Sequence, residues 1–135
     1  MAIDLPGYGA STEPLGDLSR LTNAIRADHD GILTVDPAAA ADALYHDCSS
    51  ADVELALRSL GPGGRPRSRP RRAAWQERPS THAVCTDDRA LPVPLQRALA
   101  ERADEVAAWP TGHSPFSRPD LVTDLVAARA RGAET

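Results

Sequence analysis

The sequence contains no lysine and few aromatic residues. All 15 of its cationic side chains are arginines, and aromatic residues make up 4% of the chain. The net charge of -4 argues against a main role in binding nucleic acid or an anionic membrane, because both require an excess of positive charge. We attribute the missing lysine and the abundant alanine to coding bias, so neither indicates a chemistry.

Cysteine is also scarce. Cys48 and Cys85 lie far apart and show neither C-x-x-C spacing nor the Cys/His spacing of a zinc site. The sequence therefore predicts neither a structural metal nor a disulfide framework, and we expect two buried free thiols. No residue pattern points to a cofactor.

Long apolar runs are absent as well. A membrane-spanning helix needs about 20 apolar residues, and no segment approaches this length. The first residues lack the basic stretch and apolar core of a signal peptide, so we expect a cytoplasmic protein without membrane contact. A chain of 135 residues that is 41% hydrophobic fits one globular domain with a modest core.

The first half of the chain divides into two segments. Residues 1–30 are expected to form a strand end at 1–3, a Pro- and Gly-containing loop at 4–9, and a helix over 17–27 that Gly31 ends. Residues 31–61 are expected to form a helical, lid-like segment. Its helices begin at Asp36-Pro37 and at Ser49, where short polar side chains cap free backbone amides.

Residues 62–78 read as a linker rich in arginine and proline. Prolines and glycines between Gly61 and Arg72 rule out a regular element, and the like charges repel one another. The alternative function, binding of RNA or another anion, lacks the interleaved aromatic residues on which bases stack. It would show as an affinity that falls steeply with salt.

Residues 79–135 alternate between strand and helix patterns. A β-prone run at 81–86 ends at Asp87 and Asp88, and a helix begins at Pro94. A second strand over 106–109 leads into a loop with His113, and Pro119 opens the last helix. This order predicts an α/β fold with a short parallel sheet and flanking helices.

Asp88 and His113 are the candidate site residues. Each follows a predicted strand, and the carboxyl ends of parallel strands gather functional side chains at one edge of a sheet. The 25 residues between them accommodate one helix and one strand, so we expect the carboxylate beside the imidazole. Spacing alone leaves another interpretation open, in which Asp88 is a turn or cap residue and His113 a loop residue that bonds locally.

Two stretches resemble a known family. Residues 79–92 read PSTHAVCTDDRALP and residues 109–116 read WPTGHSPF. They resemble the acid and histidine segments of small α/β-hydrolases of the plant esterase and hydroxynitrile-lyase type. In that family the triad runs Ser, Asp, His, so the resemblance implies that Asp88 is the orienting carboxylate and His113 the general base. Asp87 aligns one place too early, and it remains the alternative carboxylate.

Other segments extend the resemblance more weakly. Residues 3–11 resemble the strand end and loop that precede the nucleophile segment. Residues 30–37 and 44–49 resemble the lid helices of the same enzymes. The resemblance thus implies a partial α/β-hydrolase fold with a small helical lid.

The serine nucleophile of that family is missing. The sequence contains no G-x-S-x-G elbow. Ser114 follows Gly112-His113, but Phe116 replaces the required glycine and Pro115 has no backbone N–H for an oxyanion. Ser11 lacks the second glycine, while Ser49 and Ser50 read as helix caps.

The resemblance therefore implies an incomplete hydrolase of small carboxylic esters, truncated or internally deleted, with little or no activity alone. The alternative is a non-catalytic protein that binds a ligand or partner, or pairs with itself through an exposed sheet edge. Marginal stability is expected in either case, because half a sheet buries less apolar surface than a whole one. His29 and His46 are expected to be solvated or lid residues.

Overall fold

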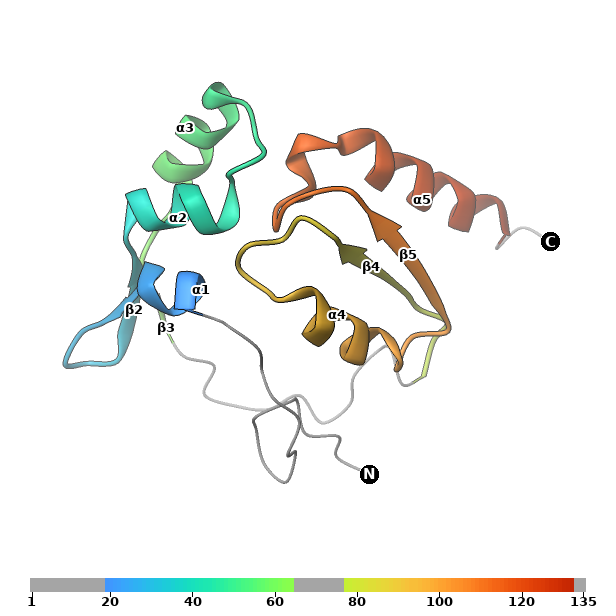
Figure 1. Cartoon of the computed structure of the whole chain (residues 1–135), viewed down its shortest axis with the longest axis horizontal. Helices are drawn as coiled ribbons and strands as arrows, with labels where there is room; N and C mark the ends of the chain where they lie inside the picture. The colour runs from blue at the N-terminus through green and yellow to red at the C-terminus, as the bar shows by residue number, and fades with distance from the viewer. Residues whose placement is uncertain (1–18, 65–76, 133–135) are drawn as a thin grey trace.

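A computed structural model describes residues 19–64 and 77–132, which form two groups of elements (Figure 1). The first group contains α1 (Ser19–Ala24), β1 (Ile25–Ala27), β2 (Ile32–Val35), α2 (Pro37–Leu44), α3 (Ser50–Ser59) and β3 (Gly63–Gly64). The second contains β4 (Thr81–Cys85), α4 (Val93–Ala100), β5 (Glu105–Trp109), the 3₁₀ helix η2 (Pro115–Ser117) and α5 (Pro119–Gly132). The expected strand end and loop of residues 1–9 lie outside the described residues.

The second group is built on a parallel pair of strands. Strands β4 and β5 are hydrogen-bonded in register from Thr81 opposite Glu105 to Cys85 opposite Trp109. Helix α4 connects them and packs against β4, with Leu95 and Ala100 buried. The predicted order of strand, helix, strand and helix is confirmed, and both strands end at the same edge because they are parallel.

The first group contains a β-hairpin where the sequence pattern predicts the end of a helix. The helix expected over residues 17–27 stops at Ala24, and β1 pairs antiparallel with β2. The turn between them is built by Asp28, whose Oδ1 accepts from the amides of Asp30 and Ile32 at 2.9 and 2.8 Å. Gly31 completes it at a φ of 77°, a conformation that costs glycine little. The helix prediction is therefore wrong for Ile25–Ala27.

Two further expectations need correction. Residues 30–37, which resembled a lid helix, contain β2 instead, so the lid-like segment is helical only in α2 and α3. Gly63 and Gly64, expected in an irregular linker, pair with β2 as β3. Residues 65–76 of the expected linker lie outside the described part of the chain, and its last two residues, 77 and 78, belong to no helix or strand.

The two predicted helix starts are confirmed. The Asp36 side chain accepts from the Ala39 amide at 2.9 Å, and Ser49 Oγ accepts from the Asp52 amide at 3.2 Å. Both bonds satisfy an amide that has no partner within its helix. The caps therefore fix where α2 and α3 begin.

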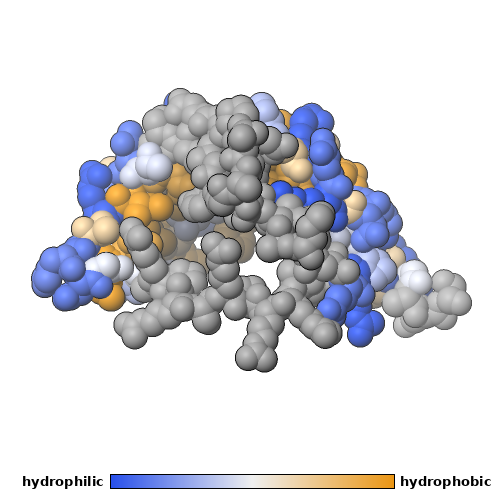
Figure 2. All heavy atoms as spheres, turned by 90° about the horizontal axis from the view of Figure 1, so that it is seen from below, coloured by the Kyte–Doolittle hydropathy of each residue, from blue (hydrophilic) through white to orange (hydrophobic). Residues whose placement is uncertain are grey.

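The apolar core of the described residues is small and rich in alanine. Its buried members are Ala24, Ala40, Ala43, Val84, Ala90, Leu95 and Ala100. Larger apolar side chains reach the surface, and Figure 2 shows apolar side chains lying between hydrophilic ones on one face. Cys48 and Cys85 are free, but they are partly rather than fully buried. No helix in the described ranges is long and apolar enough to cross a membrane.

Candidate functional site

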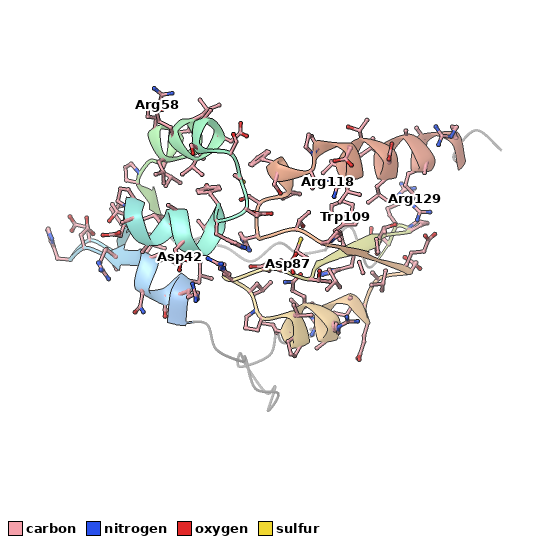
Figure 3. The ribbon with its side chains drawn as sticks, turned by 45° about the horizontal axis from the view of Figure 1, so that its top comes forward. Asp42, Arg58, Asp87, Trp109, Arg118 and Arg129 are labelled. Carbon is pink, nitrogen blue, oxygen red and sulfur yellow. The ribbon has the colours of Figure 1, made fainter. Side chains whose placement is uncertain are left out.

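Asp88 and His113 lie together beyond the carboxyl ends of the two parallel strands. Asp88 is in the turn after β4, and His113 is in the loop after β5, which ends at Trp109 (labelled in Figure 3). His113 Nδ1 lies 3.0 Å from Asp88 Oδ2. The expected proximity is therefore observed, while the catalytic roles stay a prediction.

Backbone amides fix the Asp88 carboxylate. Its Oδ1 accepts from the amides of Ala90 at 2.7 Å and Leu91 at 2.9 Å. The Asp88 side chain is only 3% exposed. Asp88 is therefore a turn residue through Oδ1, as the alternative interpretation expects. Its other oxygen, Oδ2, faces His113.

Gln96 of α4 supports the same carboxylate. Its Nε2 donates to Asp88 Oδ2 at 3.1 Å, and its Oε1 accepts from the Cys85 amide at 2.8 Å. Nε2 also lies 3.2 Å from the Cys85 carbonyl and 2.8 Å from that of Leu91. Sequence reasoning missed this role. The available signal was an uncharged polar residue next to Leu95 on an amphipathic helix, where burial requires hydrogen-bond partners.

The electrostatics of the pair favour its ionised form. Burial disfavours the charge on Asp88, but hydrogen bonds from His113, Leu91 and Ala90 outweigh it and hold the pKa of Asp88 below its ordinary 3.8. The hydrogen bond to Asp88 raises the pKa of His113 above 6.5, with burial opposing and the opposite charge contributing further. A carboxylate facing Nδ1 assigns the proton to Nδ1 and leaves Nε2 as a base.

The loop that carries His113 is also held from the first group of elements. Asp47, in the turn between α2 and α3, accepts from the Gly112 amide at 2.6 Å and from Ser117 Oγ at 2.7 Å. The turn that carries Asp88 is held in the same way, because Asp42 of α2, labelled in Figure 3, accepts from Arg89 at 2.8 Å. Neither aspartate was singled out from the sequence, because the partners of each lie far along the chain.

The remaining candidates lie apart from this pair or lack the needed groups. Asp87 is exposed, and its amide donates to the Thr111 carbonyl at 3.0 Å. Ser114 precedes Pro115 at the start of η2, so the next residue offers no oxyanion donor. Ser49 caps α3, whereas Ser50, also expected to be a cap, is the first residue of that helix. Ser11 lies outside the described residues.

The two histidines of the first half, His29 and His46, differ in their exposure to solvent. The His29 side chain is 89% exposed, with Nε2 at 3.2 Å from Asp30, which agrees with a solvated residue. His46 lies between α2 and α3 in the lid-like segment, and its Nδ1 is buried without a hydrogen-bond partner, so of the two expectations it meets that of a lid residue and not that of a solvated one. Within residues 19–64 and 77–132, no group of three His, Cys, Asp or Glu side chains could hold a metal ion.

Comparisons with known proteins agree with this architecture. No family model matches the chain. An α/β-hydrolase, nvfD from Aspergillus novofumigatus, is 33% identical over 91 residues, covering 63% of this chain and 36% of the relative. A pyrethroid hydrolase from Sphingobium faniae superposes with a TM-score of 0.70 at 18% identity, covering 98% of this chain and 57% of that one. Polyneuridine aldehyde esterase superposes with a TM-score of 0.63 at 19% identity, covering 78% of this chain and 47% of the esterase chain.

The fold is thus a partial α/β-hydrolase fold, with a short parallel sheet, flanking helices and an Asp–His pair at the carboxyl ends of its strands. The chain is similar in sequence to one α/β-hydrolase and in fold to several solved ones, over part of their length. It spans about a third of the curated relative and about half of the solved structures that it resembles.

Proposed function

We propose that this chain provides the acid–base part of a carboxylic-ester hydrolase, with Asp88 orienting and His113 moving the proton. The observation that carries the proposal is the 3.0 Å contact between Asp88 Oδ2 and His113 Nδ1 at the strand ends. In such a pair the imidazole takes a proton from a nucleophile and returns it to the leaving alcohol, and the carboxylate stabilises the imidazolium. A small-molecule ester is the proposed substrate, and no cofactor is required.

The chain by itself is proposed to have little or no esterase activity. Its 135 residues contain no G-x-S-x-G elbow, and Pro115 denies Ser114 an oxyanion donor. The oxyanion hole and nucleophile provide much of the rate enhancement in acyl transfer. Full activity would therefore require a serine from another segment or another chain.

Two assays on the purified chain test this proposal. A fluorophosphonate probe should label no serine, because none is activated. An activated aryl acetate should nevertheless be hydrolysed slowly, at a rate that rises through the pKa of His113, since the pairing of Nδ1 with Asp88 leaves Nε2 as the base and the side chain is 36% exposed. The rate should disappear in His113→Ala and fall in Asp88→Asn.

Either assay can overturn the proposal. Stoichiometric serine labelling that disappears in His113→Ala would reveal a working nucleophile and a complete esterase. Equal hydrolysis rates for the wild type and His113→Ala would remove the basis for assigning His113 as a base.

A second candidate function is partner binding without catalysis. In the described part of the chain the parallel sheet has two strands, and Val106 on β5 is 57% exposed. An unpaired sheet edge beside apolar surface favours pairing with another chain. Light scattering should then report a dimer or larger species, and a ligand-free monomer would count against this function.

A further inference from the structure

One carboxylate oxygen, Asp47 Oδ2, accepts hydrogen bonds from both ends of the loop that carries His113. Asp47 Oδ2 accepts from the amide of Gly112, directly before His113, at 2.6 Å. The same atom accepts from the hydroxyl of Ser117, at the end of η2, at 2.7 Å. Asp47 therefore joins the two ends of the loop that lies between them.

The approach of Asp47 to this loop is close enough to constrain the sequence. A Cβ atom added to Gly112 would lie 2.4 Å from Asp47 Oδ1 and 2.7 Å from His46 Cε1. The neighbouring Cys48 adds a weaker contact, with Sγ at 3.9 Å from the Ser114 carbonyl. The α2–α3 turn and the histidine loop thus fit together through several contacts.

Asp47 is ionised in this position. Burial disfavours its charge, but the hydrogen bonds from Gly112 and Ser117 and the proximity of His46 hold the pKa of Asp47 below 3.8. Hydrogen bonds to an ionised acceptor are about twice as strong as neutral ones. The two bonds can therefore restrain a loop whose central side chain, His113, is 36% exposed.

We propose that Asp47 is a positioning residue for His113, which ties the histidine loop to the α2–α3 turn and thereby holds the imidazole against Asp88. The inference rests on the role proposed for His113, but its test observes the imidazole and not ester turnover. Asp47 itself touches neither Asp88 nor the imidazole in any contact described above. Its effect passes through the Gly112 and Ser117 bonds.

The test is an NMR titration of the His113 ring in the whole chain, with His113→Ala used for assignment and Asp88→Asn as the reference for a lost pair. In Asp47→Ala both loop bonds are lost, so the pKa of His113 should fall towards its value in Asp88→Asn. Asp47→Asn also removes the charge but keeps an oxygen that accepts both bonds, so its His113 should titrate close to wild type. Ser117→Ala should give a smaller fall than Asp47→Ala.

Asp52→Ala is the matched control, because Asp52 is a carboxylate of the adjacent helix that accepts from Ser49. It should leave the titration of His113 unchanged. An unchanged pKa of His113 in folded Asp47→Ala would overturn the inference. So would equal shifts in Asp47→Ala and Asp47→Asn, since the effect would then be charge alone.

Loss of folding in Asp47→Ala would leave the decision to Asp47→Asn and Ser117→Ala. A wild-type titration in Ser117→Ala would then contradict the inference. The outcome is also separable from the proposed function. A lowered pKa of His113 in Asp47→Ala without His113-dependent hydrolysis in the wild type would support the positioning role and reject the ester hydrolase. Hydrolysis that depends on His113, with an unchanged pKa in Asp47→Ala, would support the hydrolase and reject the positioning role.

Discussion

Asp88 keeps a negative charge although its side chain is only 3% exposed. Two backbone amides and Gln96 hold its oxygens, and His113 adds a partner that is itself charged when protonated. A buried charge is tolerated only when its hydrogen-bonding capacity is met in this way. The amides of the turn after β4 therefore hold the carboxylate independently of its contact with the imidazole.

The Asp88–His113 interaction should depend on pH. The pKa of His113 is raised in the folded protein, so its contribution to stability is complete below 6.5 and is lost as the pH rises through the raised value. The pKa of Asp88 is lowered, so its contribution is complete above 3.8 and is lost as the pH falls through the lowered value. The pair is thus strongest between these two ordinary values.

A double-mutant cycle of Asp88→Asn and His113→Ala, measured by chemical denaturation, tests this dependence. We expect a coupling free energy of about 1 kcal/mol near about pH 5, reduced from about 1.5–3 for a buried charge-assisted bond by the exposure of His113. It should shrink as the pH rises through the raised pKa of His113, because the imidazole then loses its charge. A coupling that grows with pH would contradict the assignment.

Gln96 should be important for stability out of proportion to its size. Gln96→Leu keeps a similar volume but leaves the Cys85 amide and the Leu91 carbonyl without this partner, and removes a donor to Asp88. We expect a loss of about 3 kcal/mol in the free energy of unfolding. The exposed neighbour Arg97, replaced by alanine, should change it by less than about 0.5 kcal/mol. Similar losses in the two variants would show that the amide network is unimportant.

At the scale of elements, the histidine loop depends on a close fit to the α2–α3 turn. The turn and the loop meet where Gly112 faces Asp47, and a side chain there has no room. Loops that carry functional groups need a rigid support, because their own backbone provides little. Here the support comes from a segment that precedes the loop by about half of the chain.

Gly112→Ala tests this fit. The added methyl group would overlap the Asp47 carboxylate, so we expect a loss of about 1–3 kcal/mol and a weaker contact between His113 and Asp88. Gly61→Ala is the control, since an added Cβ there meets nothing within 4 Å. Thermal unfolding of the two variants should separate them, and a wild-type midpoint for Gly112→Ala would mean that the turn yields without cost.

At the scale of the whole molecule, the described core is too poor in large side chains to give high stability. Five of its seven buried apolar residues are alanines, whereas Leu55, Phe116 and Val126 are 59%, 70% and 62% exposed. Burial of apolar area is the main favourable term in folding, and alanine contributes little of it. The molecule should therefore be marginally stable as a monomer.

Calorimetry combined with light scattering measures this directly. We expect a melting midpoint below about 65 °C for the monomer, within the range of ordinary mesophilic domains. A higher midpoint should appear only with self-association, which would bury the exposed apolar groups and make the midpoint depend on concentration. A concentration-independent, cooperative transition well above this temperature in a monomer would contradict the expectation.

The sequence determined those parts of this protein that depend on neighbours along the chain. The caps at Asp36 and Ser49, the alternation of strand and helix after residue 79, and the positions of Asp88 and His113 after strands all follow from local patterns. Such features involve residues within one or two turns of each other, so their energies are visible in short stretches of sequence.

Only the tertiary structure decided the rest. Ile25–Ala27 became a strand because β2 lay opposite it, which outweighed the helical spacing of the preceding leucines. Asp47 became a partner of Gly112 and Ser117 because folding brought residues 65 and 70 positions apart into contact. The order of residues carries no local signal for such pairs, because their interaction energy exists only once both elements are packed.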